Sequence, residues 1–266
     1  MNPVYVDKIG ILAPGLTGWE QARATLAGHR TYQSAPLPPL KPAALAPDVR
    51  RRTSDHIRFA VEVATDTSRG LSDVTRRLAT VFASCDADGR ITHDILTEVA
   101  KDTPQVSPTR FHNSVNNAAA GYWCMAVGSQ QPSTSVAAWD DVAAAGLLEA
   151  VAQVLLEHTR VLLVIHDLPM PEPLNSARPV HAAFGAGMLL SRARSAESIC
   201  ALALELAPSG ESESTLTDPG LETLRRDNPA ARSLALICAI ARNQATTVVM
   251  PFLGHQVLRI GVQPCA

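Results

Sequence analysis

Apolar runs of strand length alternate with segments of helical period along most of the chain. β-branched apolar runs predict strands at Val4–Leu12, Leu78–Ser84, Ser133–Val136 and Val161–His166. Amphipathic or apolar segments predict helices at Trp19–Ala27, 51–70, Ile91–Ala100, Phe111–Val127 and about Asp140–Glu157. This alternation is typical of a layered α/β fold with a largely parallel sheet.

The pattern changes after residue 166. Residues 181–192 and 195–208 predict two strands joined by a tight turn, and residues 209–220 form a polar linker. A helix is expected over Leu221–Arg242, with Pro229 as a point where it can break, and residues 246–264 have strand character. We expect one domain over residues 1–266.

Composition excludes several classes of function. The 266 residues are 46% hydrophobic and 18% charged, and the net charge of -2 favours neither nucleic acid nor anionic lipid as a partner. The most apolar run, residues 161–169, is too short to span a membrane, and the start of the chain has no signal-peptide pattern. We therefore expect a cytoplasmic protein.

Metal and cofactor chemistry has no motif to support it. The five Cys are scattered without a CxxC pair, which is typical of reduced thiols and unlike a zinc site. No GxGxxG or GxxxxGK phosphate-binding motif occurs. We expect neither a metal nor a cofactor.

One strand-to-helix junction has the form of a nucleophile site. Residues 133–149, STSVAAWDDVAAAGLLE, run from a β-branched stretch into an alanine-rich helix. A helix N-terminus at such a junction lowers the pKa of a thiol, and its N–H groups can stabilise an oxyanion. The junction contains no Cys, however, and no His lies near it in the sequence.

Several motifs, in sequence order, resemble the N-terminal half of a β-ketoacyl synthase. They are SPTRFHNSVNNAAAGYWCMAVG (107–128) followed by PSTSVAAWDDVAAAGLLEA (132–150), with VDKIGILAPG (6–15), RRTSDHIRFAVEVA (51–64) and AFGAGMLLSR (183–192) in support. The resemblance covers residues 4–207. It implies a thiolase-like layered α/β fold whose N-terminal half is largely intact and whose C-terminal part, residues 208–266, is reduced.

The chain departs from that family at the active site. The family uses a Cys nucleophile at the junction and two His beyond it, but matching the motifs puts Val136 at the Cys position. Val cannot attack a thioester. The sequence around His255 matches neither family His motif.

The resemblance therefore implies a chain-length factor of the type II polyketide or aryl polyene kind. Such a subunit is not catalytic. It forms a heterodimer with an active ketosynthase and shapes the tunnel for an acyl chain held on an acyl carrier protein, which it meets indirectly.

Two other functions stay open at this point. The chain could be a diverged acyltransferase or hydrolase with Ser133 or Ser135 as nucleophile, but this reading needs a His within hydrogen-bond reach. It could also be a homodimeric scaffold that binds no substrate.

The resemblance assigns three groups of residues. The expected partner interface contains Phe111, Asn113, Ser114, Asn117, Tyr122, Trp123, Ser133, Thr134 and Ser135. The acyl-tunnel candidates are Ile91, Asp94, Ile95, Val99 and Phe111. Val136 and Trp139 belong to the vestigial pocket, which the Trp139 ring can plug. For the aromatic interface residues and the tunnel helix, ordinary core packing within this chain is the alternative.

Overall fold

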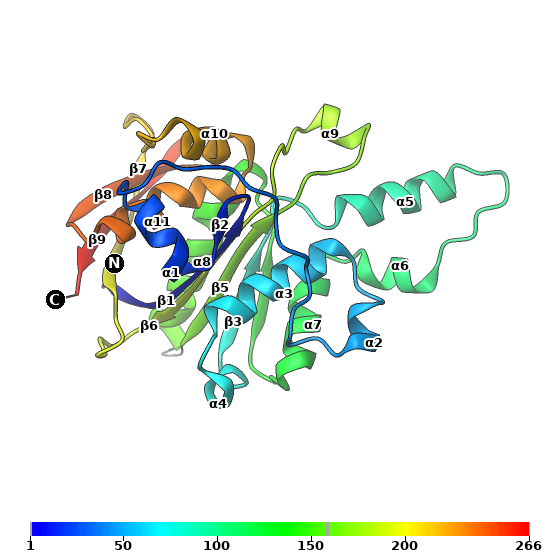
Figure 1. Cartoon of the computed structure of the whole chain (residues 1–266), viewed down its shortest axis with the longest axis horizontal. Helices are drawn as coiled ribbons and strands as arrows, with labels where there is room; N and C mark the ends of the chain where they lie inside the picture. Colours follow the sequence, from blue (N-terminus) through cyan, green and yellow to red (C-terminus); the bar gives the residue numbers. More distant parts are fainter. Residues whose placement is uncertain (1, 158–159, 266) are drawn as a thin grey trace.

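A computed structural model describes residues 2–157 and 160–265 (Figure 1). Within these residues one mixed sheet has the strand order β4-β3-β5-β6-β1-β7-β9-β8, and β2 pairs with β1. Its strands are β1 (Val4–Ala13), β2 (Leu16–Thr17), β3 (Ala79–Ala83), β4 (Ser133–Val136), β5 (Val161–Asp167), β6 (Phe184–Ser191), β7 (Cys200–Pro208), β8 (Thr246–Phe252) and β9 (Gln256–Pro264).

The longer helices are α1 (Trp19–Leu26), α3 (Asp55–Thr67), α5 (Gly89–Val99), α7 (Ala118–Val127), α8 (Val142–Glu157), α10 (Pro219–Asp227) and α11 (Leu234–Arg242). The short ones are α2 (Pro47–Arg50), α4 (Ser72–Thr75), α6 (Pro108–Asn113) and α9 (Leu174–Ala177), with 3-10 turns at η1 (Trp139–Asp141) and η2 (Ala230–Ser233). Among the described residues, no helix is long and apolar enough to cross a membrane.

The prediction of a largely parallel sheet is wrong. In the described part of the chain only β3 pairs in parallel, with β4 on one side and β5 on the other, and the pairings along the rest of the sheet are antiparallel. A parallel pair needs a long crossover connection, usually with a helix on the sheet. Helix α8 provides one between β4 and β5, whereas β5 returns into β6 through a connection that contains only the short α9.

Strands β6 and β7 confirm the two strands predicted after residue 180, but they are not a hairpin. Strand β1 lies between them and pairs antiparallel with both. The apolar pattern of β1 was visible in the sequence, whereas its insertion between two later strands is a long-range pairing that no local pattern encodes.

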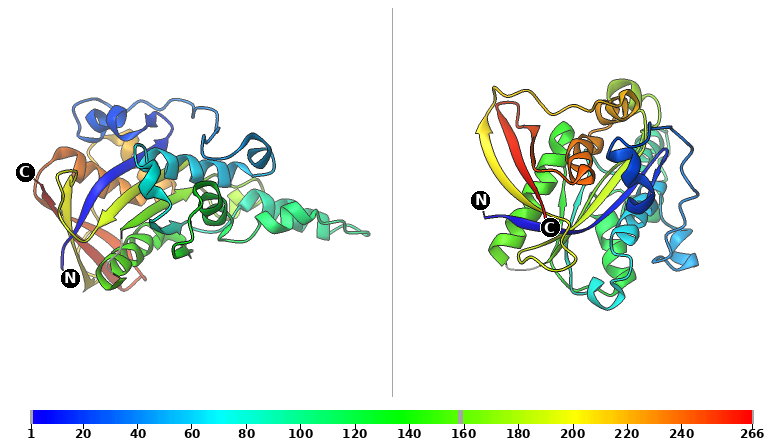
Figure 2. Two further views of the ribbon diagram at one scale, coloured as in Figure 1. Left: turned by 90° about the horizontal axis from the view of Figure 1, so that it is seen from below. Right: turned by 60° about the vertical axis from the view of Figure 1, so that its left-hand side comes forward.

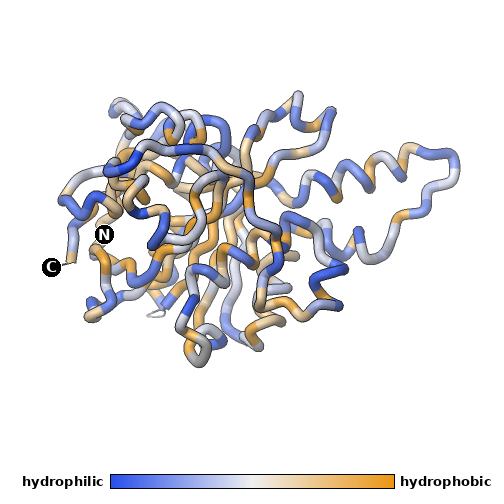
Figure 3. The backbone as a smooth tube through the Cα atoms, in the orientation of Figure 1, coloured by the Kyte–Doolittle hydropathy of each residue, from blue (hydrophilic) through white to orange (hydrophobic). Residues whose placement is uncertain are grey.

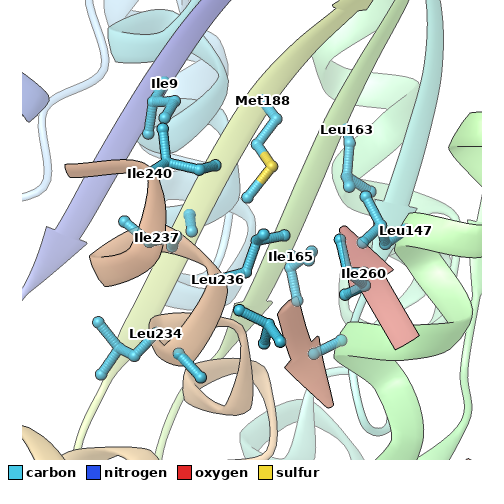
Figure 4. Packing of buried hydrophobic residues seen from close by; sticks show 14 of the residues in the cluster. Ile9, Leu147, Leu163, Ile165, Met188, Leu234, Leu236, Ile237, Ile240 and Ile260 are labelled. Carbon is cyan, nitrogen blue, oxygen red and sulfur yellow. The ribbon is translucent and has the colours of Figure 1, made fainter. Parts of the chain in front are cut away.

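Alternate residues of the central strands point to opposite faces of the sheet. Phe82 and Val164 face α3 and α7, whereas Val81, Leu163 and Ile165 face α8 and α11. Helices α8 and α11 also contact β8, so they lie between the central strands and the β7–β9–β8 strands (Figures 2 and 4). The C-terminal residues thus complete the main core.

Helices α5 and α6 form an arm that projects from this body (Figures 1 and 2). Asp88 caps α5 by accepting a hydrogen bond from the Ile91 N–H at 3.0 Å. Ile91 is the only residue of α5 that is buried. Figure 3 shows apolar residues on this arm as well as along the central strands.

The single helix predicted over Phe111–Val127 is wrong, because α6 ends at Asn113 and α7 begins at Ala118. In the break, the Ser114 hydroxyl donates to the Phe111 carbonyl and the Asn113 amide donates to the Arg52 carbonyl. Such side-chain bonds to backbone compete with helical ones. The break expected at Pro229 is confirmed, because α10 ends before it and α11 begins after it.

Candidate functional site

The strand-to-helix junction turns at Trp139 and not at Val136. Val136 lies within β4, opposite Ala83 of β3, and is half-buried. Trp139 has a φ of 48°, a left-handed conformation that is rare for a bulky residue and often marks functional sites. Helix α8 begins three residues later, at Val142.

The Trp139 ring does not plug a pocket within this chain, which corrects the expectation from the sequence. It is 64% exposed. The guanidinium of Arg178 lies 4.3 Å from the ring centre, in cation–π geometry. Arg178 also forms an ion pair with Asp140 at 3.1 Å. These contacts hold the ring at the surface beside the edge strand.

Neither serine of β4 has the base that a nucleophile needs. The Thr80 hydroxyl donates to Ser133 Oγ at 2.8 Å, and Ser135 Oγ has no hydrogen-bond partner among residues 2–157 and 160–265. A serine nucleophile requires a His within hydrogen-bond reach. The hydrolase alternative therefore lacks its activating group in the described structure.

The thiol of Cys85, which follows the neighbouring strand β3, is also unsuited to attack. Its side chain is buried at the end of β3. Burial raises the pKa of the thiol far above its usual range, and the neighbouring Asp167 carboxyl raises it further. The thiolate is the reactive form of Cys, so this residue stays inert at neutral pH.

A buried polar cluster ties the end of β5 to the C-terminal part of the chain. Asp167 accepts hydrogen bonds from the Cys85 N–H at 2.7 Å, the Ser84 hydroxyl at 2.9 Å and the Ala230 N–H at 3.0 Å. Burial raises the pKa of Asp167 to about 7. The cluster was missed in the sequence, where its only signal is the polar end of the apolar run VLLVIHD.

Potential metal ligands come close together in the same place. Cys85, Asp86 and Asp167 each offer an atom within 4.8 Å of the others, the only such group among the described residues. The Asp167 oxygens already accept three hydrogen bonds, as described above. We therefore interpret the cluster as structural.

A cavity of about 530 Å³ opens where the arm joins the body. Ile91 of α5 and Leu168 and Met170, which follow β5, supply apolar lining, whereas His56 of α3 and Asp88 are polar. His56 Nε2 lies 3.1 Å from Nε2 of the fully buried His166. Burial lowers the pKa of both imidazoles, so both are neutral at pH 7.

A second cavity of about 650 Å³ lies between β1, α1 and α3. Burial raises the pKa of two carboxyls in its wall, Glu62 and Asp66. None of the residues selected from the sequence lines it, so the cavity at the base of the arm is the better candidate site.

The tunnel candidates separate into two sets. Ile91 and Asp94 line the cavity at the base of the arm. Ile95, Val99 and Phe111 do not, and the Phe111 side chain is 66% exposed.

The interface candidates also separate, by burial. Asn113, Tyr122 and Trp123 are buried inside this chain, so the expectation that they face a partner is corrected. The Tyr122 hydroxyl donates to Asn113 Oδ1 at 3.0 Å, an internal bond. The other candidates are exposed or half-buried: Phe111, Ser114, Asn117, Ser133, Thr134 and Ser135.

Comparison with known proteins identifies the family. Residues 19–251 match the β-ketoacyl synthase N-terminal domain family, and the chain belongs to it. The match extends past residue 208, where the motifs in the sequence had become unrecognisable. No curated protein matches the chain.

Solved structures share the fold. A chain of the ketosynthase ApeO in complex with its chain length factor ApeC, from Xenorhabdus doucetiae, is similar with a TM-score of 0.73 and 22% identity, covering 98% of this chain and 100% of that one. A chain of AntDE:AntF, a type II polyketide synthase acyl-carrier protein in complex with its ketosynthase, has a TM-score of 0.73, 12% identity and 99% coverage of both chains.

A ketosynthase from module 1 of the bacillaene synthase of Bacillus amyloliquefaciens gives a different coverage. Its TM-score is 0.58 with 11% identity, and the match covers 85% of this chain but only 50% of that one. The fold is thus the thiolase-like layered fold expected from the sequence, and it corresponds to about half of that ketosynthase.

Proposed function

We propose that this chain is a non-catalytic chain-length factor that forms a heterodimer with a Cys-bearing ketosynthase. The observation that carries the proposal is the junction of β4 and α8, where Val136 and Trp139 stand and neither nearby serine has a His partner. The similar solved complexes, one with a chain length factor and one with an acyl carrier protein, support it.

The proposed interface begins at the open edge of the sheet. Strand β4 is the last strand in the order and, among the described residues, pairs only with β3. An unprotected edge strand with unpaired N–H and C=O groups is a template for another strand. Ser133, Thr134, Ser135 and Val136 carry no charge that would repel one.

The arm supplies apolar surface to the same proposed interface. Leu96 and Val99 of α5 are 56% and 54% exposed, and Phe111 of α6 is exposed as well. Apolar and aromatic side chains that gather on an unpartnered surface are typical of protein interaction sites. We propose that these residues contact the ketosynthase.

The cavity at the base of the arm is proposed to receive the far end of the growing acyl chain. Ile91 and Met170 would set its depth, because an added two-carbon unit overpacks a cavity that is already full. The complex would act on chains held by an acyl carrier protein in the cytoplasm. The absence of disulfides among the five Cys agrees with that compartment.

Co-purification tests the proposal. The tagged chain is co-expressed with a Cys-bearing ketosynthase of the same organism, and the mass of the eluted complex is measured. We expect a one-to-one complex, with acyl label from the carrier protein only on the ketosynthase. A stable homodimer that ignores the ketosynthase would support the scaffold alternative, and acyl label on this chain would overturn the non-catalytic assignment.

Two matched substitutions locate the interface. Phe111→Asp should weaken association at least about tenfold, because it places a charge in the apolar contact. Leu206→Asp is the control, since Leu206 is 42% exposed on β7, away from the arm, and should leave association unchanged. Equal effects of the two changes would contradict the assignment of the arm.

A further inference from the structure

The cavity at the base of the arm is lined by both polar and apolar side chains. Ile91, Leu168 and Met170 can contact a hydrocarbon chain. His56 and Asp88 present hydrogen-bonding groups to the same space. A ligand that matches both kinds of side chain is a hydrocarbon chain with a polar group at its end.

The histidine pair limits what that polar group can be. Two neutral imidazoles with Nε2 atoms 3.1 Å apart share one hydrogen bond, in which one Nε2 donates and the other accepts. If His56 Nε2 donates, its Nδ1 is an acceptor, and if His56 Nε2 accepts, its Nδ1 is a donor. The bond to His166 uses Nε2 of His56 and leaves the His56 Nδ1 for a ligand. A hydroxyl group matches it in either tautomer, because a hydroxyl both donates and accepts.

The charges around the cavity do not favour an anionic chain end. Four arginines line it, but they are accompanied by three aspartates, and Arg58 and Arg110 form ion pairs with Asp55 and Asp94. The buried Asp88 Oδ2 has no hydrogen-bond partner in the described part of the chain and would repel a carboxylate. A methyl end would fit no better, because it would remove water from His56 without replacing its hydrogen bond.

We propose that His56, held by His166, selects acyl chains whose far end carries a hydroxyl group. The inference rests on the proposed function, since the chain end reaches this cavity only in the complex with a ketosynthase. His56 is a specificity-determining residue in this proposal, and His166 is a positioning residue that fixes its ring.

The test uses the heterodimer and carrier-protein-bound acyl chains of equal length that end in a methyl, a hydroxyl or a carboxylate. We expect kcat/KM for elongation to favour the hydroxyl end over either other end by about tenfold, the effect of one buried hydrogen bond. His56→Phe should reduce that preference below about twofold. His93→Phe, on α5 but outside the cavity lining, is the matched control and should keep it.

A second readout needs no substitution. Loading the wild-type complex with the hydroxyl-ended chain should shift the imidazole ¹⁵N resonances of His56, and the methyl-ended chain should not. Absence of this shift, or an end-group preference that His56→Phe leaves intact, overturns the proposal. A preference for the carboxylate end also overturns the proposal, and it would assign recognition of the chain end to the arginines that line the cavity.

Different results would overturn the proposed function and the selection by His56. If the complex does not form, or if product length is the same without this chain, the proposed function is wrong and the selection by His56 falls with it. If the complex forms and Ile91→Phe shortens the product while Leu206→Phe does not, the proposed function stands. Equal rates for the three chain ends would then refute only the selection by His56.

Discussion

Helices α8 and α5 both carry apolar side chains, but these side chains have opposite surroundings in the structure. Nine of the 16 residues of α8 are buried between the central strands and β8. Of the 11 residues of α5, only Ile91 is buried, and the apolar Leu96 and Val99 face outward. Most of the apolar surface of α8 is thus covered within this chain, whereas most of that of α5 is not.

This difference separates residues that stabilise the chain from residues available to a partner. Burial of apolar area drives both folding and association, so the side chains already buried in the body have no further contribution to make to binding. Those exposed on the arm and beside the edge strand β4 can still contribute.

The largest expected difference between the body and the arm is in the effect of replacing Trp123 and Phe111 on the free energy of unfolding. Trp123 is 1% exposed, so Trp123→Ala should lower the free energy of unfolding of the isolated chain by about 3–5 kcal/mol. Phe111→Ala should change it by less than about 0.5 kcal/mol. Denaturant unfolding of both variants measures this, and similar losses would remove the distinction between body and arm.

A pH test probes the histidine pair at the boundary between the two regions. The folded chain holds the pKa of His166 well below the ordinary 6.5, mainly through burial and then through His56. As the pH falls below about 6.5, the unfolded chain binds protons that the folded chain does not, so stability decreases by up to about 1.4 kcal/mol per pH unit for each such group.

Replacing both His56 and His166 by Leu should therefore flatten the loss of stability between pH 7 and pH 5. Asp167 acts in the opposite direction, because its raised pKa of about 7 makes the folded chain bind an extra proton as the pH falls. The wild type and the double variant share this contribution, so it cancels when the pH dependences of their stabilities are subtracted. Replacement of the exposed His29 is the control, and an unchanged slope in the double variant would contradict the burial argument.

The open edge of the body is tested by Ser135→Pro. The carbonyls of Pro132 and Val136 accept bonds from β3, so the N–H of Ser135 points to the free side of β4. Its loss should weaken association with the ketosynthase about fivefold, the effect of one hydrogen bond, and leave the β3 ladder intact. Ser135→Val keeps the N–H and should bind normally, and equal binding by both variants would argue against strand pairing.

The smallest effect is expected at the base of the arm. Asp88→Ala removes the α5 cap and should destabilise the helix by about 1 kcal/mol, seen as faster amide exchange within α5 and unchanged exchange in α8. Asp88→Asn keeps a capping oxygen and should exchange nearly as slowly as the wild type. Faster exchange in α8 as well would mean that arm and body unfold together.

Much of the local structure could be predicted from the sequence. The apolar runs at β1, β3 and β5 and the helical spacing of α3, α5 and α8 gave the elements, because burial on one face imposes a period of 2.0 or 3.6 residues. The motifs around β4 identified the family and the missing Cys. The break between α6 and α7 was not predicted, because it depends on the Asn113 bond to Arg52, which is distant in the sequence.

Tertiary structure alone decided strand order and which apolar residues remain outside. The sequence by itself determined that this chain has the elements of a β-ketoacyl synthase N-terminal domain and no Cys at the junction. It could not determine that Trp123 is interior while Phe111 and Trp139 are exposed, nor that His56 meets His166 across 110 residues. Local periodicity records only that a side chain prefers burial, whereas the partner that buries it is set by long-range packing.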